Sequence, residues 1–213
     1  MIVPILVSLF VSLGSEAACL ADSFKIDKVD LTSSEMKSME DTVGRFESTM
    51  LPKIPSDHEI IIRLEALSPR VNAEIVKENG SVSIVVWGGM LSHPKMSPAT
   101  LNLLLCHELG HYLGGPPLKS RTGWSSTEGQ SDYYSTSNCL KDLGVDETQF
   151  ITSAIALTAI YAEATQQLPP HLEECDQTVA TRMNYGYPTI QCRLDTLIAG
   201  WNERPRPKCW FIE

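Results

Sequence analysis

An apolar segment between Ser97 and Gly115 carries two histidines, and it is the feature that most limits how this chain can fold. Ser97 and Pro98 are typical of the N-cap and first position of a helix, because serine accepts a backbone N–H and proline needs none there. The segment then reads PATLNLLLCHELGHYL and is followed by Gly-Gly-Pro-Pro, which ends a helix. A helix over about residues 98–113 is therefore predicted, with His107 and His111 one turn apart on the same face.

His107, Glu108 and His111 stand in the order H-E-x-x-H. Two imidazoles on one helix face can bind a single cation, and Zn²⁺ suits them because it is a borderline-soft ion that prefers tetrahedral N, S and O ligands. Glu108 lies beside the first histidine, where it can take a proton from a zinc-bound water and later give it to a leaving amine. Only three positions of the pattern are fixed, so a helix with two merely polar histidines stays open as the alternative.

A catalytic zinc centre needs a third protein ligand, and the segment STEGQSDYY supplies a candidate. Glu128 and Asp132 are spaced i and i+4 and share one face of the next predicted helix. Glu128 completes a His₂Glu set that leaves a fourth position for water, and Asp132 accepts an N–H from a ligand histidine. The alternative is that Ser125-x-x-Glu128 is only a capping box and that Asp132 is a solvated acid.

Local signals predict further helices on both sides of this segment. Thr32 and Glu35 form a capping box, and apolar residues follow it at steps of three and four: Met36, Met39, Val43, Phe46 and Met50. Pro52 and Pro55 end that helix. Later patterns predict helices over about 125–143, 146–168 and 192–199.

Three β-rich runs, over residues 59–64, 71–77 and 82–87, precede the histidine helix. Asn79-Gly80 between the last two runs predicts a hairpin. The expected fold is therefore α+β: a small, partly antiparallel sheet packed against the H-E-x-x-H helix, followed by a mainly helical C-terminal part. We expect the strand over 82–87 to be an edge strand that could bind an extended peptide.

The N-terminal residues are typical of a secretory signal peptide. Ile2 to Leu13 is an apolar run too short to span a bilayer, and Ser15-Glu16-Ala17 is a small-x-small cleavage pattern. Residues 1–17 are thus predicted as a signal peptide, and residues 18–213 as one exported, periplasmic or secreted domain. A short membrane anchor and a lipoprotein site at Cys19 stay open.

The cysteines fit export. The chain has six of them, none in a C-x-x-C pair, and an even number in an exported chain favours disulfides over a cysteine zinc cluster. Their pairing cannot be derived from the sequence. For Cys106, next to His107, a bridge and a buried free thiol both stay open.

Composition excludes one class of partner. The net charge is −9 and no run of Lys or Arg occurs, which argues against a nucleic acid or an anionic membrane as the main ligand. His58, His93 and His171 lie in turn-like settings and are expected on the surface.

The spacing His107-Glu108-x-x-His111 followed by Glu128-x-x-x-Asp132 resembles the gluzincin metallopeptidases. Within them it is most similar to the CAAX prenyl proteases and bacterial heat-shock membrane proteases, over about residues 82–195. Val85-Val86-Trp87-Gly88-Gly89-Met90-Leu91 resembles the strand and turn before their zinc helix, and Tyr187-Pro188-x-x-x-x-Arg193 resembles a later segment, with tyrosine in place of histidine. This chain lacks their further membrane-spanning segments, so it is not expected to be membrane-embedded.

The resemblance implies a zincin-like fold, one zinc ion and hydrolysis of peptide bonds in a peptide or protein substrate. It also implies that Arg193, with Tyr187, supplies positive charge or a hydrogen bond near the developing oxyanion. A structural ion pair of Arg193 with Asp132 or Asp195 is the alternative. Two further classes stay open for the whole chain: a catalytically silent zinc-binding exported module, and an interaction protein without metal.

Overall fold

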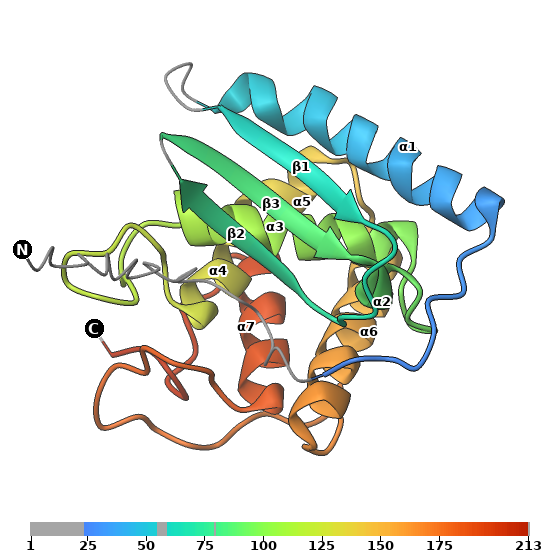
Figure 1. Ribbon diagram of the computed structural model, residues 1–213. Coiled ribbons are helices and arrows are strands. Elements are labelled where there is room, and N and C mark those ends of the chain that lie inside the picture. The colour runs from blue at the N-terminus through green and yellow to red at the C-terminus, as the bar shows by residue number, and fades with distance from the viewer. Residues whose placement is uncertain (1–23, 55–58, 79, 213) are drawn as a thin grey trace, which may run out of the picture.

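The computed structural model describes residues 24–54, 59–78 and 80–212 (Figure 1). The predicted signal peptide, Cys19, Pro55, His58 and Asn79 lie outside these residues. The strands are β1 (Ile60–Glu65), β2 (Ala73–Glu78) and β3 (Ser81–Trp87). The helices are α1 (Ser33–Met50), α2 (Gly88–Leu91), α3 (Pro98–Leu113), α4 (Glu128–Tyr134), α5 (Leu140–Asp142), α6 (Glu147–Thr165) and α7 (Ile190–Trp201). The predicted α+β class, with a small and partly antiparallel sheet, is confirmed.

The sheet is mixed and its strand order is β1-β3-β2. β2 and β3 form the predicted antiparallel hairpin, with Ile75 opposite Ile84, and β1 runs parallel to β3. The expectation that residues 82–87 form an edge strand is therefore wrong, because β3 lies between the other two strands. Strand order depends on long-range pairing, which the local pattern of β3 does not contain.

One face of the sheet packs on the helices. Val82, Ile84 and Val86 of β3 are buried, and so are Ala73 and Ile75 of β2, whereas the alternate side chains are more exposed. Figure 1 shows α3 behind the sheet, α1 along its β1 side, and α4 on the side of β2. The β2 edge is thus the edge of the sheet that lies nearest to the segment carrying Glu128.

The predicted ends of α1 and α3 are confirmed. Thr32 accepts from the N–H of Glu35 while the Glu35 side chain accepts from the N–H of Thr32, and this reciprocal pair starts α1. Ser97 accepts from the N–H of Thr100, Pro98 takes the first helical position, and α3 ends before Gly114. Along α1 the buried apolar residues are Met39, Val43, Phe46 and Met50.

The cap of α4 differs from the prediction. Thr127, not Ser125, accepts from the N–H of Gln130 and starts the helix at Glu128. The backbone of Ser126 is held by α3 instead, because its N–H donates to the carbonyl of His111 at 2.8 Å. A π-helical turn, Ser135–Cys139, then connects α4 to α5, so the predicted helix over 125–143 is a composite of three pieces.

Two disulfides tie the helices together. Cys106 on α3 bonds Cys139, which decides the open question about Cys106 in favour of a bridge, and Cys192 on α7 bonds Cys209. Among the described cysteines, Cys175 is unpaired, and it is exposed. Disulfides of this kind are typical of proteins in an oxidising compartment.

The described part of the chain, residues 24–212 apart from its gaps, holds no helix with both the length and the apolar character that crossing a bilayer requires.

Candidate metal centre

The two histidines of α3 point in the direction that the sequence pattern predicted. His107 and His111 are one turn apart, both are fully buried, and their ring centroids lie 4.7 Å apart. The close spacing follows from the i, i+4 geometry of the helix. It places two imidazoles beside a single point in the interior.

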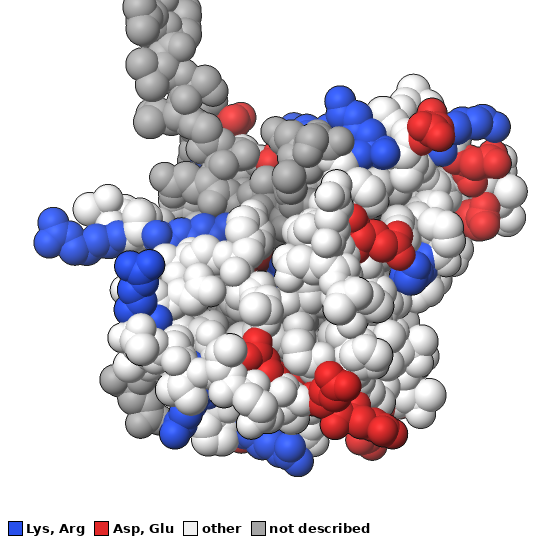
Figure 2. All heavy atoms as spheres, turned by 90° about the horizontal axis from the view of Figure 1, so that it is seen from below, with Lys and Arg blue, Asp and Glu red and all other residues white. Residues whose placement is uncertain are grey.

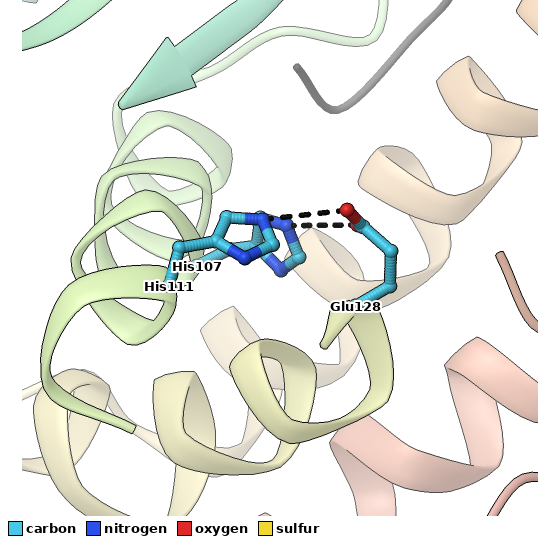
Figure 3. A group of neighbouring side chains, drawn as sticks. All are labelled: His107, His111 and Glu128. Carbon is cyan, nitrogen blue, oxygen red and sulfur yellow. Dashed lines mark ion pairs between the residues drawn. The ribbon is translucent and has the colours of Figure 1, made fainter. Parts of the chain in front are cut away.

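Glu128 faces this pair from the first turn of α4. Its Oε2 lies 3.3 Å from Nε2 of His107, and its Oε1 lies 3.4 Å from Nε2 of His111. Figure 3 shows both rings directed at this carboxylate. The donor atoms of the three side chains all lie within 4.8 Å of one another, a spacing at which one ion can reach them all. The sequence-predicted ligand set is therefore brought together.

Hydrogen bonds behind the rings decide their tautomers. Nδ1 of His111 lies 2.8 Å from both the carbonyl oxygen of Ser126 and the hydroxyl oxygen of Ser131, and Nδ1 of His107 lies 2.7 Å from Oδ1 of Asp132. A carbonyl and a carboxylate can only accept, which favours a proton on each Nδ1, and the Ser131 hydroxyl can accept from His111 as well. The lone pair of each ring is then on Nε2, which faces Glu128.

This arrangement fits a cation. Nε2 of His111 and Oε2 of Glu128 are buried acceptor atoms without a hydrogen-bond partner in the described part of the chain. Acceptors that face one another in a low-dielectric interior repel, and unsatisfied buried acceptors are costly. A cation between them removes both penalties. Two imidazole nitrogens and a carboxylate are a donor set that suits Zn²⁺ and similar divalent ions.

The protonation states favour metal binding. Burial lowers the pKa of His111 to about 3, so its Nε2 keeps the lone pair at neutral pH. Burial on its own raises the pKa of Glu128, but His111, the ammonium of Lys119 and the guanidinium of Arg193 outweigh it and hold that pKa well below its usual range. Both groups are thus in their ligating forms without the loss of a proton.

Asp132 and Arg193 form a buried ion pair behind His107. Nε and Nη2 of Arg193 lie 2.8 and 2.9 Å from the two carboxylate oxygens of Asp132, and both side chains are buried. Nη2 of Arg193 also lies 3.5 Å from Oε2 of Glu128, and its guanidinium stacks 4.1 Å from the ring centre of Tyr161. Asp132 is therefore not a solvated acid, and of the two partners considered for Arg193 it is Asp132 that binds it.

The remaining predicted residues, Glu108 and Tyr187, lie in different settings. Glu108 follows His107 on α3 and is fully buried. Tyr187 is 54% exposed, and its ring centre lies 6.0 Å from Nζ of Lys119, which in turn contacts Glu128. Tyr187 thus lies at the surface, one residue removed from the ligand carboxylate.

Two residues of the site were missed by sequence reasoning. Lys119 binds Oε1 of Glu128 at 2.8 Å, and Tyr161 of α6 packs with its ring centre 6.4 Å from that of His107. Lys119 is a single lysine in a loop and Tyr161 belongs to an ordinary apolar helix pattern. No local spacing marks either of them.

His93 corrects another expectation. It was placed on the surface, but it is buried, with Nε2 3.1 Å from Oε2 of Glu163 on α6. The partner is 70 residues away in the chain, so the turn-like local sequence gave no sign of it. His171 is exposed as expected.

No protein-family model matches this chain, and neither a curated protein nor a solved structure matches it.

Proposed function

We propose that this chain is an exported, zinc-dependent endopeptidase with a zincin-like fold. The observation that carries the proposal is the convergence of three buried ligand groups, the imidazoles of His107 and His111 and the carboxylate of Glu128, on a single point. Within the described residues the group holds three ligands, whereas closed structural zinc sites have four. A three-ligand set leaves a position for water or substrate.

The residues present fit zinc and divide the work between them. His107, His111 and Glu128 would hold the ion, which when bound lowers the pKa of its water to about 7 and polarises a carbonyl group. Glu108 takes the proton of the attacking water and passes it to the leaving amine. Asp132 keeps His107 in the tautomer that presents Nε2 to the metal, and Arg193 balances the charge of Asp132.

The free edge of β2 is a suitable place for an extended substrate. The N–H of Trp87 donates to the carbonyl of Asn72, and hydrogen-bonded pairs alternate along an antiparallel ladder. Ala73, Ile75 and Lys77 therefore direct their backbone groups away from β3. Since β2 pairs only with β3 among the described strands, these groups can pair with a peptide. Binding of an extended peptide, which was expected at residues 82–87, is therefore proposed for β2 instead.

A substitution of Glu108 tests the proposed chemistry. Glu108→Gln keeps the shape of the side chain but removes the base, so kcat on an unfolded protein such as casein should fall roughly 10²–10⁴-fold. Zinc content, measured by atomic absorption, should stay at one ion per chain. The exposed acid Glu173 offers a matched control, since Glu173→Gln should change neither value. Full turnover by Glu108→Gln would reject the assigned role.

A second function is favoured by one observation: the side chains of His107, His111 and Glu128 are all at most 1% exposed. A metal buried to this degree also suits a catalytically silent module that uses zinc to fix its structure. The two functions differ in one measurement. A silent module binds one zinc ion and hydrolyses no member of a randomised peptide library, whereas the endopeptidase cleaves some of them.

Export is supported from two sides. The predicted signal peptide directs the chain out of the cytoplasm, and the bridges Cys106–Cys139 and Cys192–Cys209 suit an oxidising compartment.

A further inference from the structure

A lysine contacts the carboxylate of the proposed metal ligand Glu128, at the same oxygen that faces His111. Nζ of Lys119 lies 2.8 Å from Oε1 of Glu128, and the lysine side chain is 17% exposed. A side chain in this position reaches from the interior carboxylate to the surface. Among the described residues that form ion pairs with Glu128, Lys119 has the greatest solvent access, since His107, His111 and Arg193 are all buried.

The loop that carries Lys119 is held in place by its backbone. The N–H of Lys119 donates to the carbonyl of Ser125 at 2.8 Å, and the N–H of Thr127 donates to the carbonyl of Pro117 at 2.9 Å. Leu118 and Ser126 pair as an antiparallel bridge between these two bonds. Lys119 is therefore positioned by the same short ladder that leads into Glu128.

The outer side of this loop is hollowed and carries only positive charge. A cavity of about 450 Å³ is lined by Pro116, Pro117, Leu118, Lys119, Ser120, Arg121 and Tyr185, with no acidic side chain among them. The ring of Tyr187 lies near Lys119 as well. Figure 2 shows Lys and Arg along the left margin of the face seen from below, the side on which Figure 1 places this loop, and Asp and Glu at the lower right.

The charges near this cavity favour an anionic ligand when a divalent metal is bound. A divalent metal would bring two positive charges and Lys119 brings a third, against the one negative charge of Glu128, while Asp132 and Arg193 cancel. The sum of these charges next to the cavity is therefore positive. In a protein with 26 acidic and 17 basic residues, this local excess is opposite in sign to the whole molecule.

We propose that Lys119, together with Arg121 in the lining of the same cavity, binds a carboxylate of the substrate, so that the preferred peptides carry an acidic side chain close to the bond that is cut. This inference rests on the proposed peptidase function. An ammonium hydrogen-bonded to a carboxylate is a strong, charge-assisted contact. An acidic side chain in the lining would compete with the substrate carboxylate for Lys119, and the lining has none. Lys119 is a specificity residue in this scheme, and Glu108 remains the base.

Matched peptides test the specificity. Acetylated and amidated peptides that differ only in Glu against Gln at one position, scanned along the sequence, are given to the zinc-loaded protein. At one position we expect kcat/KM for the Glu peptide to exceed that for the Gln peptide at least tenfold. Lys119→Met should remove this preference mainly through KM, and Lys119→Arg should restore part of it. Lys37→Met, on the exposed face of α1, is the control and should change nothing.

Two results of this experiment would overturn the proposal. One is equal cleavage of Glu and Gln peptides at every position by the wild type. The other is an equal loss on both peptides in Lys119→Met, together with loss of zinc, which would show that Lys119 only supports Glu128. Zinc content is therefore measured in every variant.

A binding measurement separates this inference from the proposed function. Zinc-loaded Glu108→Gln protein is titrated calorimetrically with glutarate and with its uncharged diamide, glutaramide. We expect glutarate alone to bind, and Lys119→Met to weaken it at least tenfold. Unchanged glutarate affinity in Lys119→Met would mean that the carboxylate binds the metal directly, which contradicts the role of Lys119. If no peptide is cleaved but this titration succeeds, the peptidase proposal fails and the carboxylate site stands.

Discussion

Two acceptors outside the metal centre decide what His107 and His111 can bind. The carbonyl of Ser126 and the carboxylate of Asp132 each take the Nδ1 proton of one ring, which leaves both Nε2 lone pairs facing Glu128. A histidine without such a partner can rotate or exchange tautomers, and its affinity for a metal falls. The candidate site therefore includes Ser126 and Asp132 as well as the three proposed ligands.

Burial of His111 has a consequence for the metal-free protein. The pKa of His111 is about 3 in the folded chain and about 6.5 in an unfolded one. Below pH 6.5 the unfolded state therefore binds a proton at this ring, whereas the folded state does not. The free energy of unfolding should therefore fall as the pH drops. Between pH 6.5 and pH 5, above the range of ordinary carboxyl groups, this one group contributes a loss of roughly 1–2 kcal/mol.

Urea titrations of the metal-free protein check this value. His111→Gln removes the titrating ring and should flatten the pH dependence by about that amount. Equal slopes for the wild type and His111→Gln would show that the ring is not held neutral by the fold.

The sequence pattern predicted the candidate ligands but not all of the residues that contact them. His107, His111, Glu128 and Asp132 have spacings fixed by helix geometry, so a single sequence displays them. Lys119 and Tyr161 reach the site through the tertiary fold, and their local surroundings resemble those of any loop lysine or core tyrosine. The partner of Arg193 also stayed open until the two helices could be seen together.

At the scale of elements, the site depends on how closely α3 approaches α4. A Cβ at Gly110 would lie 2.8 Å from the carbonyl oxygen of Ser131, inside the distance that real Cβ atoms keep. Gly110 stands between Glu108 and His111, on the part of α3 that Glu128 must approach. The absence of a side chain here allows the two ligand-bearing helices to come together.

Gly110→Ala should therefore separate them. The clash is with backbone, which cannot move without shifting α4, so we expect a loss of about 1–3 kcal/mol in stability and at least tenfold weaker zinc binding. Gly44→Ala on α1 is the matched control, because open space surrounds that position and alanine favours a helix. Calorimetric zinc titration and urea unfolding of both variants give the comparison. Unchanged zinc affinity in Gly110→Ala would show that the α3–α4 distance does not limit the site.

Element boundaries were predictable where capping and periodicity are local. Thr32 and Ser97 both cap helices as their sequences indicate. Thr127 replaced Ser125 because three consecutive hydroxyl residues can each cap a helix, and contact with His111 selects among them. The central place of β3 was not predictable, since only the parallel pairing with β1 puts it there.

At the scale of the whole molecule, three helices contribute side chains to the candidate metal centre: α3 carries the two histidines, α4 carries Glu128 and Asp132, and α7 carries Arg193. Cys106–Cys139 links α3 to the turn after α4, and Cys192–Cys209 fastens α7 to the C-terminal segment. That segment places the buried Trp210 against Gly129, directly after Glu128, where a Cβ would meet the indole at 2.4 Å. The ligand Glu128 is thus supported from behind by residues more than 80 positions later in the chain.

The most direct measurement is an anomalous difference map at the zinc edge, from crystals of the intact, metal-loaded protein. We predict one peak, bonded at about 2.0–2.2 Å to Nε2 of His107, Nε2 of His111 and the carboxylate of Glu128. A map without density between these three side chains, or with zinc bound only elsewhere on the molecule, would contradict the account.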